Sequence, residues 1–146
     1  MKLRGVRLSI GIALAGIVIG CAHAAQSAPD GAANPLVGTK WQVHALGANA
    51  VLESAKPTLE FSAVDKVSGT GSCNRFNGVV TVSGKSITFG PMATTRMACA
   101  DAVNRQEATY FKALTEAEWF TIHDTTLSIY TKAMDLPLVF VRSQAG

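Results

Sequence analysis

Two short stretches of the sequence carry side chains whose types and spacing could do chemistry. They supply two cysteines, two asparagines and two arginines, namely Cys73, Asn74, Arg75, Asn77, Arg96 and Cys99. A cysteine pair supports three arrangements: a disulfide, two buried free thiols, or a reactive thiol activated by a close partner. The sequence has no Cys-x-x-Cys motif, which leaves the reactive thiol as the weakest of the three.

The third cysteine, Cys21, follows a segment that resembles an export signal. Basic residues near the N-terminus precede an apolar run, so we predict a signal peptide over residues 1–20. The run is too short to span a bilayer, which takes about 20 apolar residues. Val18-Ile19-Gly20-Cys21 is similar to the bacterial lipobox, in which the cysteine receives a diacylglyceryl group. The alternative is cleavage before Ala25, after the small-x-small site Ala22-His23-Ala24.

Export places the two remaining cysteines in an oxidising compartment. A disulfide is the default there, so we predict that Cys73 and Cys99 are bridged, with buried free thiols as the main alternative. We expect either an outer-membrane lipoprotein anchored through Cys21 and facing the periplasm, or a soluble periplasmic or secreted protein. Residues 21–35 are rich in Ala and lack apolar periodicity, which predicts a flexible tether before a domain over residues 36–146.

The polar side chains beside the cysteines allow a structural and a functional interpretation. The run from Asn74 to Gly78 predicts a tight turn, because Asn-Gly readily supplies positive φ. In the structural interpretation, which we favour, these residues shape the turn and Arg96 donates hydrogen bonds to loop carbonyls. In the functional interpretation, four of them form a recognition loop: Asn74, Arg75, Asn77 and Arg96.

Composition excludes several classes of partner and site. The formal net charge of +3 comes from Lys2, Arg4 and Arg7, so the chain without them is neutral. A neutral domain lacks the basic patch that binds phosphate backbones, so we expect no nucleic-acid partner. His44 and His123 have no metal-ligand spacing, and the sequence has no Gly-x-Ser-x-Gly turn. We therefore expect no metal, no cofactor and no catalytic residues.

The rest of the chain predicts the elements that position these side chains. Short segments with a period of two predict strands near 36–45, 58–63, 66–72, 79–83, 86–89, 119–123, 127–131 and 136–142. Between 101 and 118 the apolar residues fall on one helical face, which Gln106 and Glu107 interrupt. We predict an α+β domain that is mainly β: an antiparallel curled sheet or partly open barrel with one helix packed on it.

Three motifs follow one another along the domain. They are Leu36-Val-Gly-Thr-Lys-Trp41, Gly69-Thr-Gly-Ser-Cys-Asn-Arg-Phe-Asn-Gly78 and Met92-Ala-Thr-Thr-Arg-Met-Ala-Cys99. In this order they resemble the META domain family, which includes the bacterial heat-shock protein HslJ. The family often has an aromatic residue after the glycine that matches Gly78, where this chain has Val79-Val80. The resemblance implies a small β-rich envelope domain, frequently a lipoprotein, that is associated with stress tolerance and outer-membrane integrity.

These observations give one leading hypothesis for function and one alternative. We expect a non-enzymatic envelope domain with a binding or structural role. Its partners would be the membrane, through the lipid anchor, and an unidentified envelope protein or small ligand. The alternative is a barrel that holds a small apolar ligand in its interior, as lipocalins do. An enzyme ranks below both, because the sequence shows no catalytic constellation.

Overall fold

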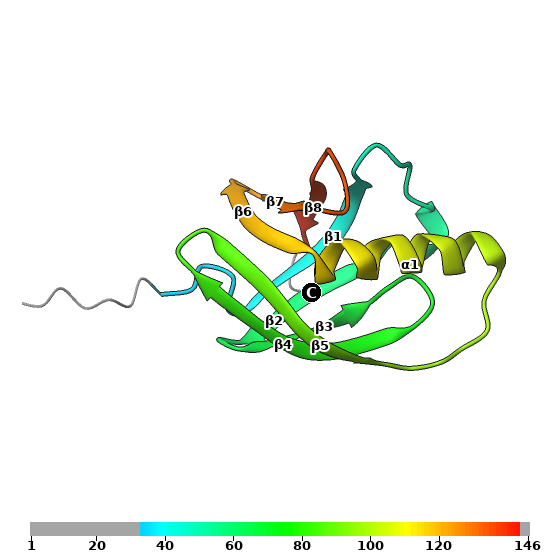
Figure 1. Ribbon diagram of the computed structural model, residues 1–146, viewed down its shortest axis with the longest axis horizontal. Coiled ribbons are helices and arrows are strands. Elements are labelled where there is room, and N and C mark those ends of the chain that lie inside the picture. The colour runs from blue at the N-terminus through cyan, green and yellow to red at the C-terminus, as the bar shows by residue number, and fades with distance from the viewer. Residues whose placement is uncertain (1–32, 144–146) are drawn as a thin grey trace, which may run out of the picture. The chain divides into compact units, whose positions relative to one another are not determined.

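The computed structural model describes residues 33–143, which form a closed antiparallel β-barrel with one α-helix (Figure 1). The predicted signal segment, Cys21 and most of the predicted tether lie outside the described residues. The strands are β1 (Thr39–Leu46), β2 (Thr58–Ala63), β3 (Lys66–Thr70), β4 (Arg75–Ser83), β5 (Ser86–Thr94), β6 (Ala117–His123), β7 (Thr126–Thr131) and β8 (Leu138–Arg142). The helices are α1 (Asp101–Thr115) and a short 3-10 turn, η1 (Glu53–Ala55).

The strands follow one another around the barrel in chain order. Each strand pairs antiparallel with the next, and β8 pairs with β1 to close the ring, with Phe140 opposite Val43. The predicted mainly β fold is therefore confirmed, and the sheet closes completely. The longest connection carries α1 and lies between β5 and β6, which pair through Ser86 and Trp119.

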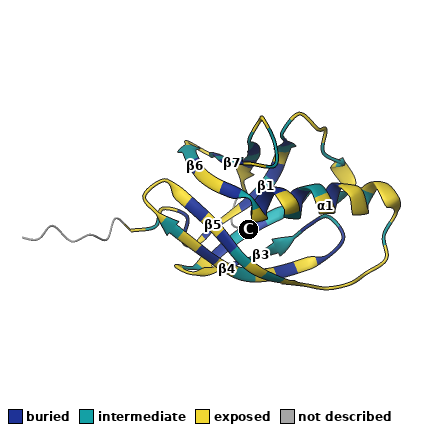
Figure 2. Cartoon of the chain, viewed as in Figure 1, coloured by how far each residue is buried: buried dark blue, intermediate teal, exposed yellow. Residues whose placement is uncertain are grey.

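The barrel interior is filled by its own side chains. Buried residues alternate with outward-facing ones along most strands, as a period of two requires (Figure 2). The large side chains that are less than 2% exposed include Trp41, Phe61, Leu127, Ile129 and Phe140, and they belong to one packed cluster. A barrel of eight strands is just wide enough for its side chains to fill, so these residues occupy the space that an interior ligand would need.

One end of the barrel is closed by the chain that leads into β1. Leu36 is fully buried there, and Gly38 turns the backbone with a φ of +76°. Thr39 Oγ1 donates to the Leu36 carbonyl oxygen and accepts the Trp41 Nε1–H at 2.7 Å. The Leu36–Trp41 motif therefore closes this end of the barrel, and the Thr39 hydroxyl and the Trp41 Nε1–H form their hydrogen bonds within the motif.

The opposite end of the barrel is covered by α1, which lies over the point where β2 begins (Figure 1). On the side of α1 that faces the barrel, Tyr110, Ala113 and Leu114 are fully buried. The Tyr110 hydroxyl donates to the Thr58 carbonyl oxygen at 3.1 Å. Burial raises the pKa of the Tyr110 hydroxyl well above its ordinary value, so the group stays a protonated donor. In residues 33–143 neither helix has the length and apolar character to cross a membrane.

Candidate functional site

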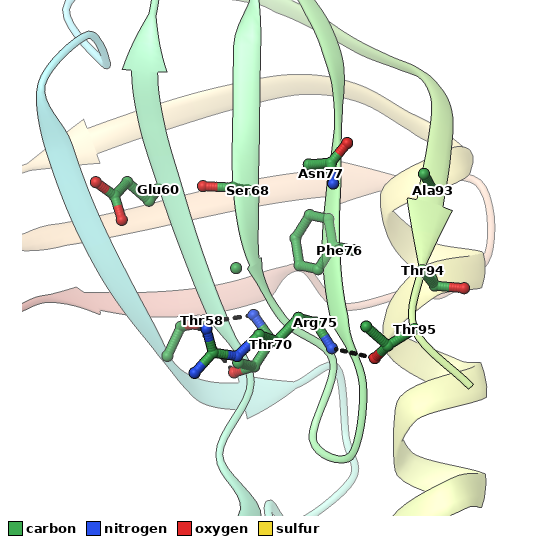
Figure 3. Close-up of a pocket in the computed structure, with 11 residues that line it drawn as sticks. Thr58, Glu60, Ser68, Thr70, Arg75, Phe76, Asn77, Ala93, Thr94 and Thr95 are labelled. Carbon is green, nitrogen blue, oxygen red and sulfur yellow. Dashed lines mark hydrogen bonds between the residues drawn. The ribbon is translucent and has the colours of Figure 1, made fainter. Parts of the chain in front are cut away.

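The outer face of four consecutive strands carries a hollow of about 570 Å³ (Figure 3). We call it the β2–β5 hollow, and it is lined by Thr58, Glu60, Ser68, Gly69, Thr70, Arg75, Phe76, Asn77, Ala93, Thr94 and Thr95. All but Thr95 lie on β2, β3, β4 or β5, and Thr95 follows β5 directly. The register of the antiparallel strands therefore sets the geometry of this site.

Strand register arranges the outward side chains of the hollow in two rows. In the first row Thr70 lies between Thr58 on β2 and Arg75 on β4. The second row crosses all four strands through Glu60, Ser68, Asn77 and Ala93. The β3 side chains in these rows, Thr70 and Ser68, are short, and the longest side chain of each row, Arg75 or Glu60, stands at one of its ends.

The floor of the hollow is apolar. Gly69 lies directly opposite Phe76, and a Cβ atom at Gly69 would come within 3.0 Å of the Phe76 ring. The same Cβ would lie 2.1 Å from the Thr58 carbonyl oxygen, so only glycine allows β2 and β3 to approach this closely. The Phe76 ring fills the space beside the glycine and forms the base of the hollow.

Threonine hydroxyls supply the polar walls, and their hydrogen bonds differ. Thr58 Oγ1 accepts the Thr70 backbone N–H at 3.0 Å and lies 3.0 Å from Thr70 Oγ1. Thr95 Oγ1 accepts the Arg75 backbone N–H and donates to Asn74 Oδ1, both at 3.0 Å. The Thr95 hydroxyl therefore both donates and accepts a hydrogen bond within the protein. Thr58 and Thr70 have two hydroxyl hydrogens, and only one of them is used in the bond between the two oxygens.

Two charged side chains lie on the hollow, Glu60 from β2 and Arg75 from β4. Arg75 is exposed, and its side chain lies toward Thr58 and Thr70 (Figure 3). Glu60 is paired with Lys40, whose Nζ lies 3.2 Å from Glu60 Oε1. A second hollow of about 490 Å³ adjoins the first and shares Ser68, Asn77 and Ala93 with it. The concave surface therefore continues along β3, β4 and β5, with a more apolar lining that includes Val67, Val79 and Pro91.

A buried carboxylate fixes the loop that leads into the Arg75 strand. Glu107 Oε2 accepts the backbone N–H groups of Cys73 at 2.9 Å and Asn74 at 2.6 Å, and Glu107 Oε1 accepts Asn74 Nδ2–H at 2.7 Å. Asn74 Oδ1 in turn accepts the Met97 N–H at 2.7 Å. Glu107 and Asn74 are each 8% exposed. Through this pair, α1 holds the β3–β4 loop against the segment that follows β5.

The neighbouring residue on α1 anchors a second loop at the same barrel end. Gln106 Oε1 accepts the Leu52 N–H, and Gln106 Nε2 donates to the Ala55 carbonyl oxygen and to Ser72 Oγ, each at 2.8 Å. Gly71 lets the β3–β4 loop pack closely against α1, since a Cβ atom at position 71 would lie 2.6 Å from the Phe111 ring. The helix thus fixes the β1–β2 and β3–β4 loops together.

The predicted disulfide is present between Cys73 and Cys99. Their Cα atoms are 6.1 Å apart, and the two residues are 26 positions apart in sequence. The bond joins the β3–β4 loop to the segment between β5 and α1. The covalent link and the Glu107 hydrogen bonds therefore hold the same loop.

Comparison with known proteins places this architecture in a family. The family model of the META domain matches residues 34–145. The chain belongs to the META domain family. An NMR structure of a protein from Burkholderia xenovorans is similar, with a TM-score of 0.62 and 27% sequence identity, over 75% of this chain and 85% of that one. A second NMR structure has a TM-score of 0.60 and 25% identity, over 73% of this chain and 90% of the other. No curated protein matches the chain at a significant level.

The four residues of the predicted recognition loop have separate places in this META domain. Arg75 and Asn77 are exposed on the same face of β4 and line the β2–β5 hollow. Asn74 is buried, and its side chain bonds to other parts of the protein. Arg96 is exposed beyond β5 and is not among the residues that line the hollow. The structure therefore joins two of the four in one candidate site.

The predicted tight turn from Asn74 to Gly78 is wrong. The chain turns earlier, where the Gly71 N–H donates to the Asn74 carbonyl oxygen at 2.8 Å and Ser72 has a φ of 126°. β4 already begins at Arg75 and includes Gly78. A Cβ atom at Gly78 would lie 2.9 Å from Met92 Cγ, so close packing against β5 explains this glycine.

Glu107 has an important role in this loop that its sequence context does not identify. It occupies a position on the buried face of α1, together with Gln106, Tyr110 and Leu114. Polar residues that interrupt the apolar face of a helix are expected to have buried partners, because an unpaired buried carboxylate is costly. That interruption of the apolar face is the signal in the sequence.

In residues 33–143, no three His, Cys, Asp or Glu side chains come together as a metal site would require.

Proposed function

We propose that this META domain is a non-enzymatic binding domain of the bacterial envelope, anchored at the outer membrane through Cys21, and that it binds its partner in the β2–β5 hollow. The hollow carries this proposal. It is a concave surface with an apolar floor and a few polar groups at fixed positions, which is the usual form of a ligand site. The partner would be an envelope protein or a small ligand.

The outer face is favoured over the interior because of how the barrel is packed. Leu36 closes one end of the barrel, and the buried residues of α1 close the other. Large side chains fill the space between the two ends. A lipocalin-like ligand would have to displace these side chains. Hydroxyl, amide and guanidinium groups and the Lys40-paired carboxylate of Glu60 surround the hollow, and these groups can bind a ligand by hydrogen bonding alone.

The proposed location rests on the cysteines. A structural disulfide persists in oxidising compartments such as the periplasm, which agrees with export of the domain. The lipobox-like sequence before Cys21 and the predicted tether support attachment at the membrane with the barrel held away from it. We propose that binding in the hollow supports the integrity of the outer membrane under stress.

A variant that fills the hollow tests this function in cells. Ser68→Trp places a large side chain at the centre of the second row, and Ser128→Trp makes the same change on the outward face of β7 as a matched control. In cells that lack their own copy, we expect wild type and Ser128→Trp to restore resistance to detergent, and Ser68→Trp and Cys21→Ala to leave resistance at least tenfold lower.

Two controls complete the test. Immunoblots and circular dichroism of the purified variants show whether Ser68→Trp is present and folded. Full restoration by a folded Ser68→Trp variant would rule out the hollow as the site of function. Full restoration by Cys21→Ala, with no incorporation of a palmitate analogue into wild type, would rule out the anchor.

A further inference from the structure

We propose that the β2–β5 hollow binds an anionic group, a carboxylate or a phosphate, in the corner formed by Arg75, Thr58 and Thr70. The inference rests on the proposed function, because it names the chemistry of the ligand for the same site. The hydrogen bonds, the charges and the shape of the corner each support it.

The two threonines leave one hydroxyl hydrogen free. Thr58 Oγ1 accepts the Thr70 N–H, and a single further hydrogen bond joins the two hydroxyl oxygens. If Thr58 donates in that bond, the Thr70 hydrogen is free, and if Thr70 donates, the Thr58 hydrogen is free. In either case the corner presents an O–H donor next to the Arg75 guanidinium (Figure 3). A ligand that fits these donors must be rich in acceptors.

The positive charge of the corner is not balanced by the protein. Within the described part of the chain, Arg75 takes part in none of the ion pairs. The other charge on the hollow, Glu60, is paired with Lys40 at 3.2 Å. The hollow therefore has an excess of one guanidinium, whose planar fork matches the two oxygens of a carboxylate or phosphate.

The floor adds a second requirement on the ligand. Gly69 and Phe76 line the base beside the corner: Phe76 belongs to the barrel core and is 3% exposed, and it reaches the hollow where Gly69 has no side chain to cover it. An inorganic anion would leave this base uncovered. An organic anion with a short apolar portion next to its charged group covers the base and satisfies the donors together. Such a group occurs in soluble carboxylates and phosphate esters, and in the headgroup region of anionic lipids.

Amide NMR of residues 22–146, which contain the whole barrel and its core, tests the site. The probes are butyrate, butyl phosphate and inorganic phosphate, with chloride as the ionic-strength control. We expect butyrate or butyl phosphate to shift the amide signals of Thr58, Thr70 and Arg75, and to bind more tightly than inorganic phosphate. Vesicles of phosphatidylglycerol, compared with phosphatidylcholine, show whether a lipid headgroup is the better source of the anion.

Four variants identify the groups that bind. Arg75→Gln should weaken binding at least tenfold, and Arg75→Lys should weaken it less, because lysine keeps the charge without the fork. Arg96→Gln removes the same charge outside the hollow and should lower affinity by about twofold at most. Glu60 lies on β2 beyond Thr58, so its carboxylate is roughly 8 Å from an anion bound in the corner. Glu60→Gln removes the repulsion between these two negative charges, which in water should raise affinity about twofold.

The outcomes separate this inference from the proposed function. Equal affinities for Arg75→Gln and Arg96→Gln, or shifts confined to another face, would overturn the anion site. If that happens while Ser68→Trp still fails to restore detergent resistance, the ligand chemistry is wrong and the hollow remains the functional surface. Anion binding that depends on Arg75, with full function in Ser68→Trp, would support the site and overturn its proposed role.

Discussion

Replacing Glu107 by glutamine should lower the free energy of unfolding by about 3 kcal/mol. The carboxylate accepts three hydrogen bonds from Cys73 and Asn74 in a buried position. A glutamine side chain has one acceptor oxygen and one NH₂ group, so in either orientation a donor faces a donor. An unsatisfied buried polar group costs about 1–3 kcal/mol, and more when the lost partner is charged. Urea denaturation of wild type and variant measures the difference.

The control is Glu116→Gln, the same substitution at the end of the same helix. Glu116 is half-buried and its backbone caps α1, but the structure gives its side chain none of the bonds that Glu107 makes. We expect this variant to stay within about 0.5 kcal/mol of wild type. Equal stabilities for Glu107→Gln and wild type would show that Glu107 does not hold the loop.

Removing the disulfide should have an effect of similar size. On the chain-entropy model, a bond between residues 26 positions apart stabilises the folded state by about 3.5 kcal/mol. In a domain of this size that loss corresponds to about 15–25 °C in Tm. Thermal unfolding of the Cys73→Ser/Cys99→Ser variant, compared with unreduced wild type, measures it.

Reductant provides the internal control for this second prediction. Adding it should lower the Tm of wild type and leave the double variant unchanged. Thiol counting on unreduced protein should find neither Cys73 nor Cys99 free. Two reactive thiols after denaturation, or a wild-type Tm that ignores reductant, would contradict the assignment of the bond as a structural element.

Both features act on the same short loop, and this loop leads directly into Arg75. Glu107 holds it from α1, and Cys99 holds it from the segment after β5. Thr95, which accepts the Arg75 N–H, lies in that segment as well. The two cysteine motifs thus build the scaffold on which one wall of the hollow stands. Their role here is structural, but the details differ from those expected: the turn lies before Asn74, and the side-chain hydrogen bonds of residues 33–143 include none from Arg96 to a loop carbonyl.

The strands were predictable because one face of each is buried. β2 and β7 alternate apolar and polar residues almost without exception, and both begin within one residue of the predicted position. The ends of α1 and β5 were less predictable. Ala117 and Glu118 fit the helical period but belong to β6, and Met92–Thr94 extend β5 although Pro91 interrupts the alternation. Tertiary pairing, which the local pattern does not contain, decides both cases.

The candidate site was predictable in part only. The motif identifies Arg75 and Asn77, but Thr58, Glu60 and Ser68 lie on two other strands, β2 and β3, and have ordinary residue types. They meet because Thr58 pairs with Thr70 and Glu60 pairs with Ser68. A shift of β2 by one residue would turn the side chains of Thr58 and Glu60 to the barrel interior. Register of this kind follows from the complete barrel, so no local sequence pattern could reveal the hollow.

Site-specific photocrosslinking in intact cells tests the central claim most directly. A photoreactive side chain at Asn77 points into the β2–β5 hollow, and one at Ser128 points outward from the far strand β7. We expect a crosslinked product from position 77, lost when Arg75→Gln or Ser68→Trp is added, and none from position 128. Crosslinks from position 128 alone, or from both positions regardless of these substitutions, would contradict binding in the hollow.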